Sequence, residues 1–369
     1  MKNFRLIGFL MMLASSALFV NCTSDPIAGP EGIAGIDGTD GLDGIDGLDS
    51  TADCRACHSK EHRDPIKAEY ALSGHATGTS WSYAGTREGC AQCHSNEGFA
   101  DFQSTGMVLP GSLTGNAITC NGCHNTKDGH RSFDFETDGN DYALRTFAPV
   151  TLIVDESITL DATNDSDLFG ASNACIACHQ PRRSGPVATD GKYLQTSEHW
   201  GPHHGPQSTM LQGIEGMNVA GTVAYPAAGT AGHQEGSSCI ACHMSEGGHT
   251  WEPSTPSSAT CTSCHDAKTE VDGYAANIEI LAGQLANVVG QKIAEDANGD
   301  YQPVFEADGT TPVMVTGIVH DNEPKTGLFD IKDAEAGWNY LFLLEDSSKG
   351  VHNPEYAKAL LTNSIELLQ

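Results

Sequence analysis

The 369-residue chain is poor in aromatic and basic residues. Aromatic side chains make up 7% of it, and 19 Lys and Arg stand against 48 Asp and Glu, which gives a formal net charge of −29. Binding to nucleic acid or to an anionic membrane surface needs clustered Lys and Arg, so both are disfavoured. Leu, Ile and Phe are also too few for a chain of this length, so another apolar body must fill part of the core.

Long apolar segments are missing except near the N-terminus. The run from Leu6 to Val20 follows a short positive start and is shorter than the roughly 20 residues that span a bilayer. Residues 1–21 are therefore predicted to be an export signal peptide. Cys22 follows directly, as does the acylated first residue of a bacterial lipoprotein, although Asn21 stands where a small residue is usual. The alternative is ordinary cleavage nearby, with Cys22 lost or left as a free thiol.

The chain has thirteen cysteines, and all except Cys22 lie in C-x-x-C pairs that are followed at once by histidine. The pairs are Cys54 and Cys57, Cys90 and Cys93, Cys120 and Cys123, Cys175 and Cys178, Cys239 and Cys242, and Cys261 and Cys264. The histidines that follow them are His58, His94, His124, His179, His243 and His265. This pattern attaches c-type haem. Two thiols on one side of a helical turn can form thioethers to the haem vinyl groups, and the next residue binds the iron as proximal ligand. Six haem c groups are predicted.

Two other interpretations of the cysteines explain less. A disulfide framework suits an exported chain with an even number of paired cysteines, but it gives no reason for a histidine after every pair. Zinc sites would combine one C-x-x-C with a second pair or with distant histidines, and again the adjacent histidine has no role.

The second axial position of each iron also needs a ligand. Sixteen histidines less the six proximal ones leave ten, which favours two histidines at every iron. Methionine, the other common ligand, would raise the haem potential. The predicted distal ligands are His75, His130, His203, His204, His249 and His352, with His199 and His233 in reserve.

Local spacing supports several of these candidates. His130 and His249 each follow a motif histidine by six residues, a loop too tight to wrap around one haem, so each should reach a neighbouring haem. His203 and His204 are adjacent, and in an extended segment they would point to opposite faces and serve two haems. His352 precedes an Asn-Pro pair that is typical of a helix start.

The sequence divides into four segments. The signal peptide leads into a lipoprotein-like acidic tether, residues 22–53, where glycine recurs at every third position as in collagen; a flexible spacer and a trimerising stalk both fit. Residues 54–268 carry all six motifs, and residues 269–369 form a haem-free, mainly helical region that packs on the haem domain. We expect a mostly α-helical and irregular fold, a multihaem cytochrome c built around stacked haems, with few short strands and C-terminal helices.

Some elements can be placed more closely. Apolar residues at helical spacing predict a helix over 278–293, and two more are expected over 335–345 and 354–368. Residues 150–160 alternate like a strand or hairpin arm. The acidic stretch 296–300 resembles the start of a calcium loop without its glycine, and a solvated turn is the better interpretation.

Four longer segments carry a family likeness: Cys90 to Phe99, His199 to Gln207, Gly247 to Trp251 and Gly350 to Tyr356. With them, most of residues 53–369 outside 270–330 resembles the multihaem c-type cytochromes of metal-reducing and related bacteria. In similar proteins the histidines of such segments are distal ligands, which supports His203, His204, His249 and His352. The resemblance implies respiratory electron transport in the periplasm, at the outer membrane or outside the cell, and for some members polymerisation into filaments.

Haem iron with both axial positions filled can only gain and lose electrons. The chain is therefore expected to be an electron carrier and no enzyme, with other redox proteins or extracellular electron acceptors as partners, a membrane contact through a lipid on Cys22, and no nucleic-acid partner. Two alternatives are a multihaem oxyanion reductase with one open haem, although the chain has no C-x-x-C-K motif, and a subunit of a polymeric cytochrome nanowire, which would be a homo-oligomer or filament.

Overall fold

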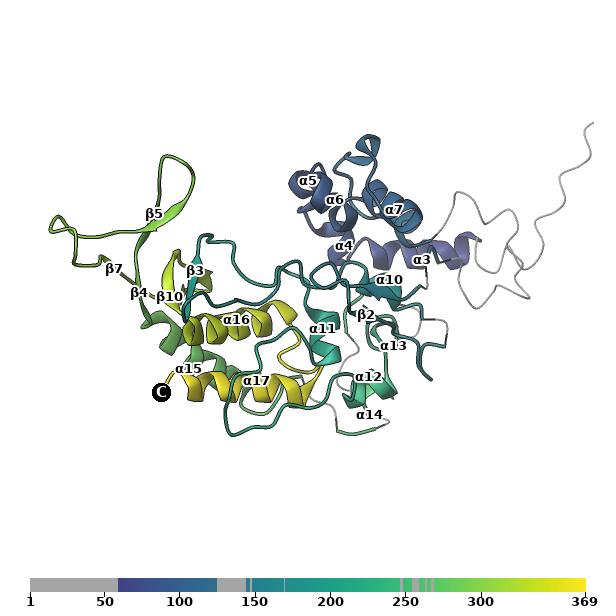
Figure 1. Cartoon of the computed structure of the whole chain (residues 1–369). Helices are drawn as coiled ribbons and strands as arrows, with labels where there is room; N and C mark the ends of the chain where they lie inside the picture. Colours follow the sequence, from purple (N-terminus) through teal and green to yellow (C-terminus); the bar gives the residue numbers. More distant parts are fainter. Residues whose placement is uncertain are drawn as a thin grey trace, which may run out of the picture. The chain divides into compact units, whose positions relative to one another are not determined.

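The computed structural model describes most of the chain after residue 58. The described ranges are 59–124, 144–146, 148–168, 170–245, 248–253, 259–262, 264–266 and 269–369. The chain divides into two units, Met1–Asp49 and Ser50–Gln369, and everything described below belongs to the second. The described part is mostly helical and irregular with short strands (Figure 1), which confirms the predicted fold class.

Short helices build the part that carries the second and third motifs. They are α3 (Lys60–Tyr70), α4 (Gly74–Thr77), α5 (Trp81–Ala84), α6 (Glu88–His94), α7 (Asn96–Thr105), the 3₁₀ turn η2 (Pro110–Ser112) and α8 (Cys120–Cys123). Ser95 separates α6 from α7, and its hydroxyl caps α7 by accepting from the Gly98 amide at 3.3 Å. A side chain at Gly98 would lie 2.5 Å from the Ala91 carbonyl oxygen, so glycine is what lets these two helices touch.

The middle of the chain winds through small elements around the other motifs. They are β1 (Val150–Thr151), β2 (Thr159–Leu160), α10 (Asn173–Ile176), α11 (Gln207–Gln212), α12 (Gly232–Gly236), α13 (Cys239–His243) and α14 (Ala259–Thr262). Strands β1 and β2 pair antiparallel, which confirms the hairpin expected over 150–160. Leu152, Leu160, Ala162 and Ile176 form a small apolar cluster beneath it.

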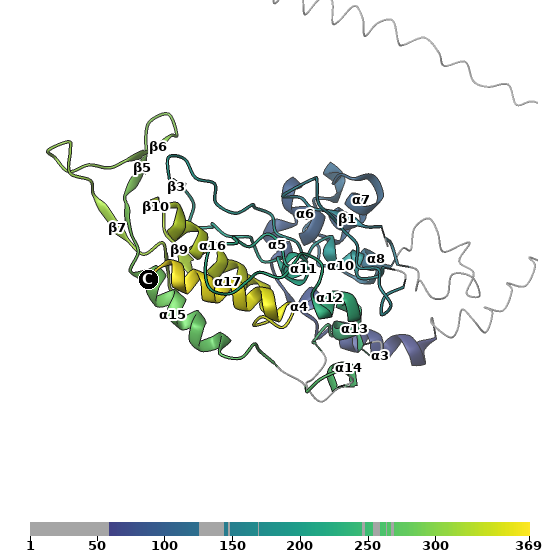
Figure 2. The ribbon, with the colours of Figure 1, turned by 60° about the horizontal axis from the view of Figure 1, so that its bottom comes forward.

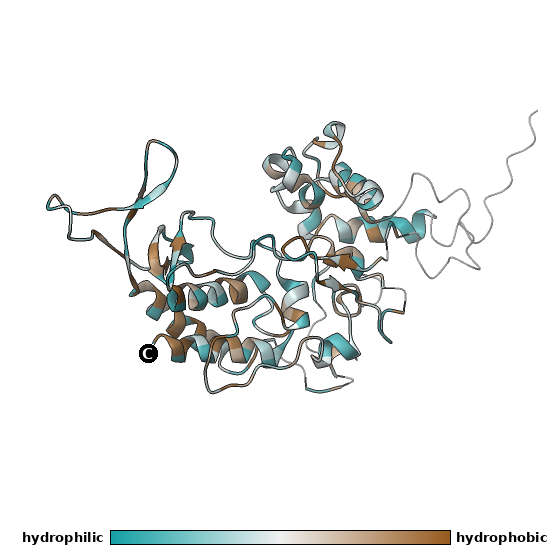
Figure 3. Ribbon diagram, in the orientation of Figure 1, coloured by the Kyte–Doolittle hydropathy of each residue, from teal (hydrophilic) through white to brown (hydrophobic). Residues whose placement is uncertain are grey.

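The larger apolar core lies between three C-terminal helices. These are α15 (Tyr274–Ala286), α16 (Ile331–Asp346) and α17 (Pro354–Leu367), which pack pairwise against one another. Two views show them side by side (Figures 1 and 2), and apolar residues gather along them (Figure 3). Trp338, Phe342, Leu281 and Leu360 are fully buried there. The helices expected over 335–345 and 354–368 are confirmed, and Asn353 caps α17 ahead of its proline as predicted.

A small sheet joins this core, and the sequence did not predict it. Its strands are β3 (Lys192–Gln195), β10 (Gly327–Asp330), β4 (Val289–Gln291) and β7 (Met314–Thr316), paired antiparallel in that order. Two further antiparallel pairs are β5 (Ile293–Glu295) with β6 (Tyr301–Pro303) and β8 (Val319–His320) with β9 (Glu323–Pro324). The C-terminal region thus combines its three long helices with short strands.

The predicted helix over 278–293 is wrong in its second half. Helix α15 ends at Ala286, and the chain turns into β4 and β5. Gly290 lets β4 pass close to β10, since a side chain there would lie 2.4 Å from the ring of Phe329 on β10. Asp296 stands at the turn between β5 and β6, where its carboxylate accepts from the amides of Asn298 and Asp300 at 2.8 and 3.0 Å. The acidic stretch is thus a surface turn, as preferred.

Two buried asparagines attach the segment after α11 to the C-terminal helices. Asn339 on α16 accepts from the Met217 amide at 2.7 Å and donates to the Met217 carbonyl at 2.8 Å. Asn363 on α17 makes the same pair of bonds with Val223, at 3.0 and 2.8 Å. These contacts join the segment after α11 to the helical core. Within the described ranges, no helix has both the length and the apolar character to cross a membrane.

Candidate haem-binding site

Five of the six C-x-x-C-H motifs lie within the described ranges, and short helices carry them. These helices are α6, α8, α10, α13 and α14, as expected from the spacing of the thiols. The ten cysteines of these motifs form no disulfide with one another. Cys22, the first motif (Cys54, Cys57 and His58) and His130 lie outside the described residues, so their roles stay predictions.

Four motif histidines each face a second histidine from a distant part of the chain. The ring centres lie 6.0–6.3 Å apart. The pairs are His94 with His203, His179 with His75, His243 with His352, and His265 with His233. Of the second partners, His75, His203 and His352 were predicted as distal ligands, and His233 was held in reserve.

This separation suits two imidazoles on opposite sides of one iron. An imidazole nitrogen binds a transition metal at about 2.0–2.1 Å and lies roughly 1.1 Å from its ring centre, so two such rings should have their centres about 6.3 Å apart. The four observed separations between ring centres, 6.0–6.3 Å, agree with this expected distance. The residues present therefore fit a haem with two axial histidines.

The hydrogen bonds of the paired rings point to the same arrangement. In six of these histidines Nδ1 lies 2.6–3.2 Å from an oxygen: Ser80 Oγ for His94, Gln207 Oε1 for His179, Val351 O for His233, Trp251 O for His243, Asp266 O for His265 and Asp346 Oδ1 for His352. Carbonyl and carboxylate oxygens only accept, so Nδ1 carries the proton in the five of these histidines other than His94, whose partner is a hydroxyl. Nε2 is then left with a free lone pair, which is what an iron ligand requires.

His203 shows the free nitrogen most directly. Its Nε2 is buried and has no hydrogen-bond partner among the described residues, which is costly for a polar atom unless something binds it. Partial burial, with His204 and Arg182 nearby, lowers the pKa of His203 to about 4. Burial likewise lowers the pKa values of His94 and His179. These rings are therefore neutral, the form that binds metal.

The adjacent His204 is placed differently from the prediction. His203 has a backbone φ of 71°, so the segment is not extended, and the two rings lie 5.0 Å apart, not on opposite faces. The His204 side chain is 75% exposed, and its Nδ1 lies 2.5 Å from Glu345 Oε2. This carboxylate raises the pKa of His204. A ligand role for His204 stays a prediction.

Two other candidates face no motif histidine in a described contact. His249 packs against Trp251, with ring centres 5.6 Å apart, and its amide donates to Glu69 at 2.9 Å. His199 is exposed. A ligand role for His249 stays a prediction, and His199 stays in reserve.

His352 has a charged hydrogen-bond partner. Its Nδ1 lies 2.6 Å from Asp346 Oδ1 at the end of α16, and the Asp346 side chain is 0% exposed. Burial opposes protonation of His352, but the carboxylate outweighs it and raises the pKa of the ring. Sequence reasoning missed Asp346, Gln207 and Ser80, since an oxygen acceptor leaves no spacing pattern in the sequence.

The motifs lie in contact with one another. Cys93 Sγ lies 3.8 Å from the Ala177 carbonyl oxygen, and Cys178 Sγ lies 4.0 Å from the Gln92 carbonyl oxygen, so the second and fourth motifs touch. The Ile240 amide of the fifth motif donates at 3.2 Å to Ser172 Oγ, which lies just ahead of the fourth motif. The second, fourth and fifth motifs therefore form a continuous row.

The sixth motif extends this row. Its facing partner His233 donates from Nδ1 to the carbonyl of Val351, the residue before His352. His352 in turn faces His243 of the fifth motif. One short segment of chain thus holds the partners of two motifs, which places the fifth and sixth sites next to each other.

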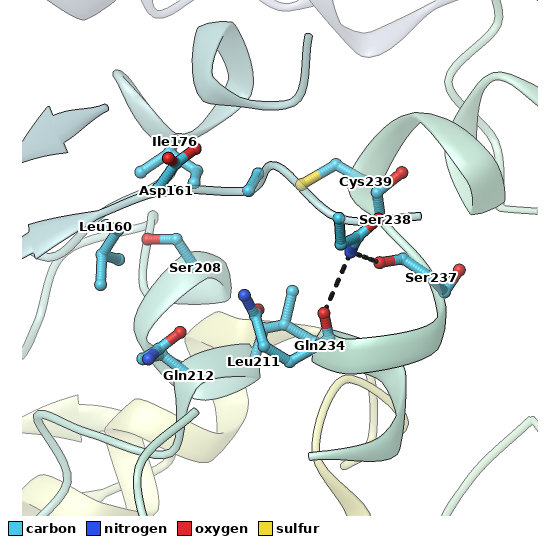
Figure 4. A pocket seen from close by; sticks show the side chains of 12 residues that line it. Leu160, Asp161, Ile176, Ser208, Leu211, Gln212, Gln234, Ser237, Ser238 and Cys239 are labelled. Atoms are coloured by element: carbon cyan, nitrogen blue, oxygen red, sulfur yellow. Dashed lines mark hydrogen bonds between the residues drawn. The ribbon is translucent and has the colours of Figure 1, made fainter. Parts of the chain in front are cut away.

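A small pocket lies beside the fifth motif (Figure 4). Cys239 lines it, together with the apolar side chains of Leu160, Ile176 and Leu211. Ser208 also lines it, and its buried hydroxyl has no partner among the described residues. The attachment cysteine thus adjoins a partly apolar space.

Comparison with known proteins returns little. No protein-family model matches the chain, and no curated protein matches it. A solved structure titled "Crystal Structure of Outer Cell Wall Cytochrome OcwA" is similar over 82% of this chain and 50% of that one, with 19% identity and a TM-score of 0.46. This chain spans about half the length of that protein. What the chain does is therefore inferred from its own residues.

Proposed function

We propose that the chain is an electron carrier that holds six c-type haems, each between two histidines. The observation that carries this proposal is that four motif histidines each face a second histidine at 6.0–6.3 Å. The C-x-x-C pairs beside them supply the covalent attachment. When bound, haem supplies an iron that takes up and releases one electron.

The chain's own residues have three tasks in this function. The motif cysteines would hold the porphyrin covalently, and the paired histidines would close both axial positions to substrates. The Nδ1 acceptors orient the rings and fix their tautomer, which leaves Nε2 for iron. A site with both axial positions filled favours electron transfer over catalysis at iron, and this is why we prefer a carrier to a reductase.

The row of motifs supports transfer through the protein. The order second, fourth, fifth and sixth follows from the hydrogen bonds between neighbouring motifs and from the segment at Val351 and His352. Motifs in direct contact would keep bound haems close, so an electron would have short steps along the row.

The place of action is inferred from the sequence. The signal peptide and the Cys22 motif support an exported chain held by a lipid at the outer membrane, in the periplasm or at the cell surface, with a redox protein or an extracellular acceptor as partner. Lipidation would be tested by the mass of the mature N-terminal peptide.

The number of haems tests the function. The mature protein, produced in a host that attaches haem c, should be heavier than its polypeptide by six haems, and the native form should bind no carbon monoxide. Replacing Cys175 and Cys178 by Ala should remove one haem and leave five. A colourless protein with the mass of the bare polypeptide would end the proposal. A native haem that binds carbon monoxide or nitrite would favour the reductase.

A further inference from the structure

The hydrogen bonds that orient the paired histidines are chemically unequal. Among the six described Nδ1 contacts of these pairs, five acceptors are neutral, namely three backbone carbonyls, one amide oxygen and one hydroxyl. The sixth acceptor is the carboxylate of Asp346, which receives Nδ1 of His352 at 2.6 Å. One site in the row therefore differs in kind from its described neighbours.

The Asp346 carboxylate is built into the protein. Its side chain is 0% exposed, and its second oxygen accepts from the hydroxyl of Ser348 and, at 3.4 Å, from the Ser348 amide. Both oxygens are thus held by donors. A buried, fully bonded carboxylate cannot turn away from the ring, and water does not screen its charge.

A carboxylate on the far nitrogen of a ligating imidazole acts through the ring. It draws the Nδ1 proton toward itself and makes Nε2 a stronger electron donor. A stronger donor stabilises the oxidised iron and lowers its reduction potential. Neutral carbonyl acceptors have the same effect to a smaller degree.

From this geometry we propose that Asp346 is a positioning residue that gives the haem between His243 and His352 a lower reduction potential than its neighbours in the row. The inference rests on the proposed function. The site lies inside the row, between the fourth and the sixth motifs. An electron moving along the row would pass through a haem of lower reduction potential there. The C-terminal region, which contributes both Asp346 and His352, would set that potential.

The test compares two carboxylates in the haem-loaded protein. Asp346→Asn keeps the size of the side chain and removes the charge. Spectroelectrochemical titration should show one haem of six shifted upward, with its reduction equilibrium constant changed at least tenfold, which is about 59 mV for one electron. The same haem should remain low-spin by EPR, with altered g-values. Glu355→Gln, the matched control, removes an exposed carboxylate in the first turn of α17 that has no described contact with a histidine, and it should leave all six potentials unchanged.

Three results decide the inference. An unchanged set of potentials in Asp346→Asn would overturn it and leave the haem count intact, whereas a wild-type protein without haem would instead end the proposed function. Asp346→Glu keeps a carboxylate at this position and should therefore keep a low reduction potential at the same haem. If Asp346→Asn does not accumulate, Ser348→Ala takes its place, since losing the Ser348 hydroxyl strengthens the bond to His352 and should lower that potential. No shift there would also overturn the inference.

Discussion

His233 and His199 have equal standing in the sequence, and the structure separates them. The His233 ring centre lies 6.0 Å from that of His265, and its Nδ1 lies 2.6 Å from the Val351 carbonyl oxygen. His199 is exposed and faces no motif histidine in a described contact. We therefore predict that His233→Ala removes one axial ligand from one iron and that His199→Ala removes none.

The size of the effect follows from the number of motifs. The cysteines and His265 still hold the haem in His233→Ala, so all six haems remain attached. One haem in six becomes five-coordinate, because the Ala side chain is too short to reach an iron that lies between two rings 6.0 Å apart. Reduced His233→Ala should bind about one carbon monoxide per chain, and its EPR spectrum should gain one high-spin iron. His199→Ala should match the wild type in both.

Spectroscopy and carbon monoxide titration of the two purified variants decide the matter. Six low-spin haems in His233→Ala would refute the assignment of His233, and so would a high-spin haem in His199→Ala. Haem content, measured in parallel, guards against a variant that has lost the group altogether.

Two further predictions concern the helical core and are read from denaturant unfolding of the haem-loaded protein. Leu360→Ala, at a fully buried position, should lower the free energy of unfolding by about 2–5 kcal/mol; Leu72→Ala, at a side chain that is 75% exposed, should change it by less than about 0.5 kcal/mol. Asn339→Ala leaves the part-buried amide of Met217 without its partner and should cost about 1–3 kcal/mol, whereas Asn287→Ala, on the surface, should be nearly neutral. If the two variants of either pair lost the same free energy of unfolding, the packing described would be contradicted.

Local features of the fold were predictable where the residues that cause them lie within one short stretch of sequence. Helix α17 starts where Asn353 and Pro354 stand, because the cap and the proline act within one turn. The short motif helices follow from the thiol spacing in the same way. Helix α15 stops at Ala286 and the chain continues into β4, whose Gly290 passes close to Phe329, a contact between residues far apart in the sequence. The sheet was missed for the same reason, since its strands are brief and drawn from distant segments.

The sequence by itself supplied the residues for the proposed chemistry: six thiol pairs, each with its histidine, and enough further histidines for a second ligand at six haem irons. It could not say which histidine faces which motif. His75 precedes the second motif but faces His179 of the fourth, and His203 follows the fourth but faces His94 of the second. The physical reason is the width of the porphyrin. A short loop cannot pass around it, so the second ligand must come from another segment, and only tertiary packing brings that segment into place.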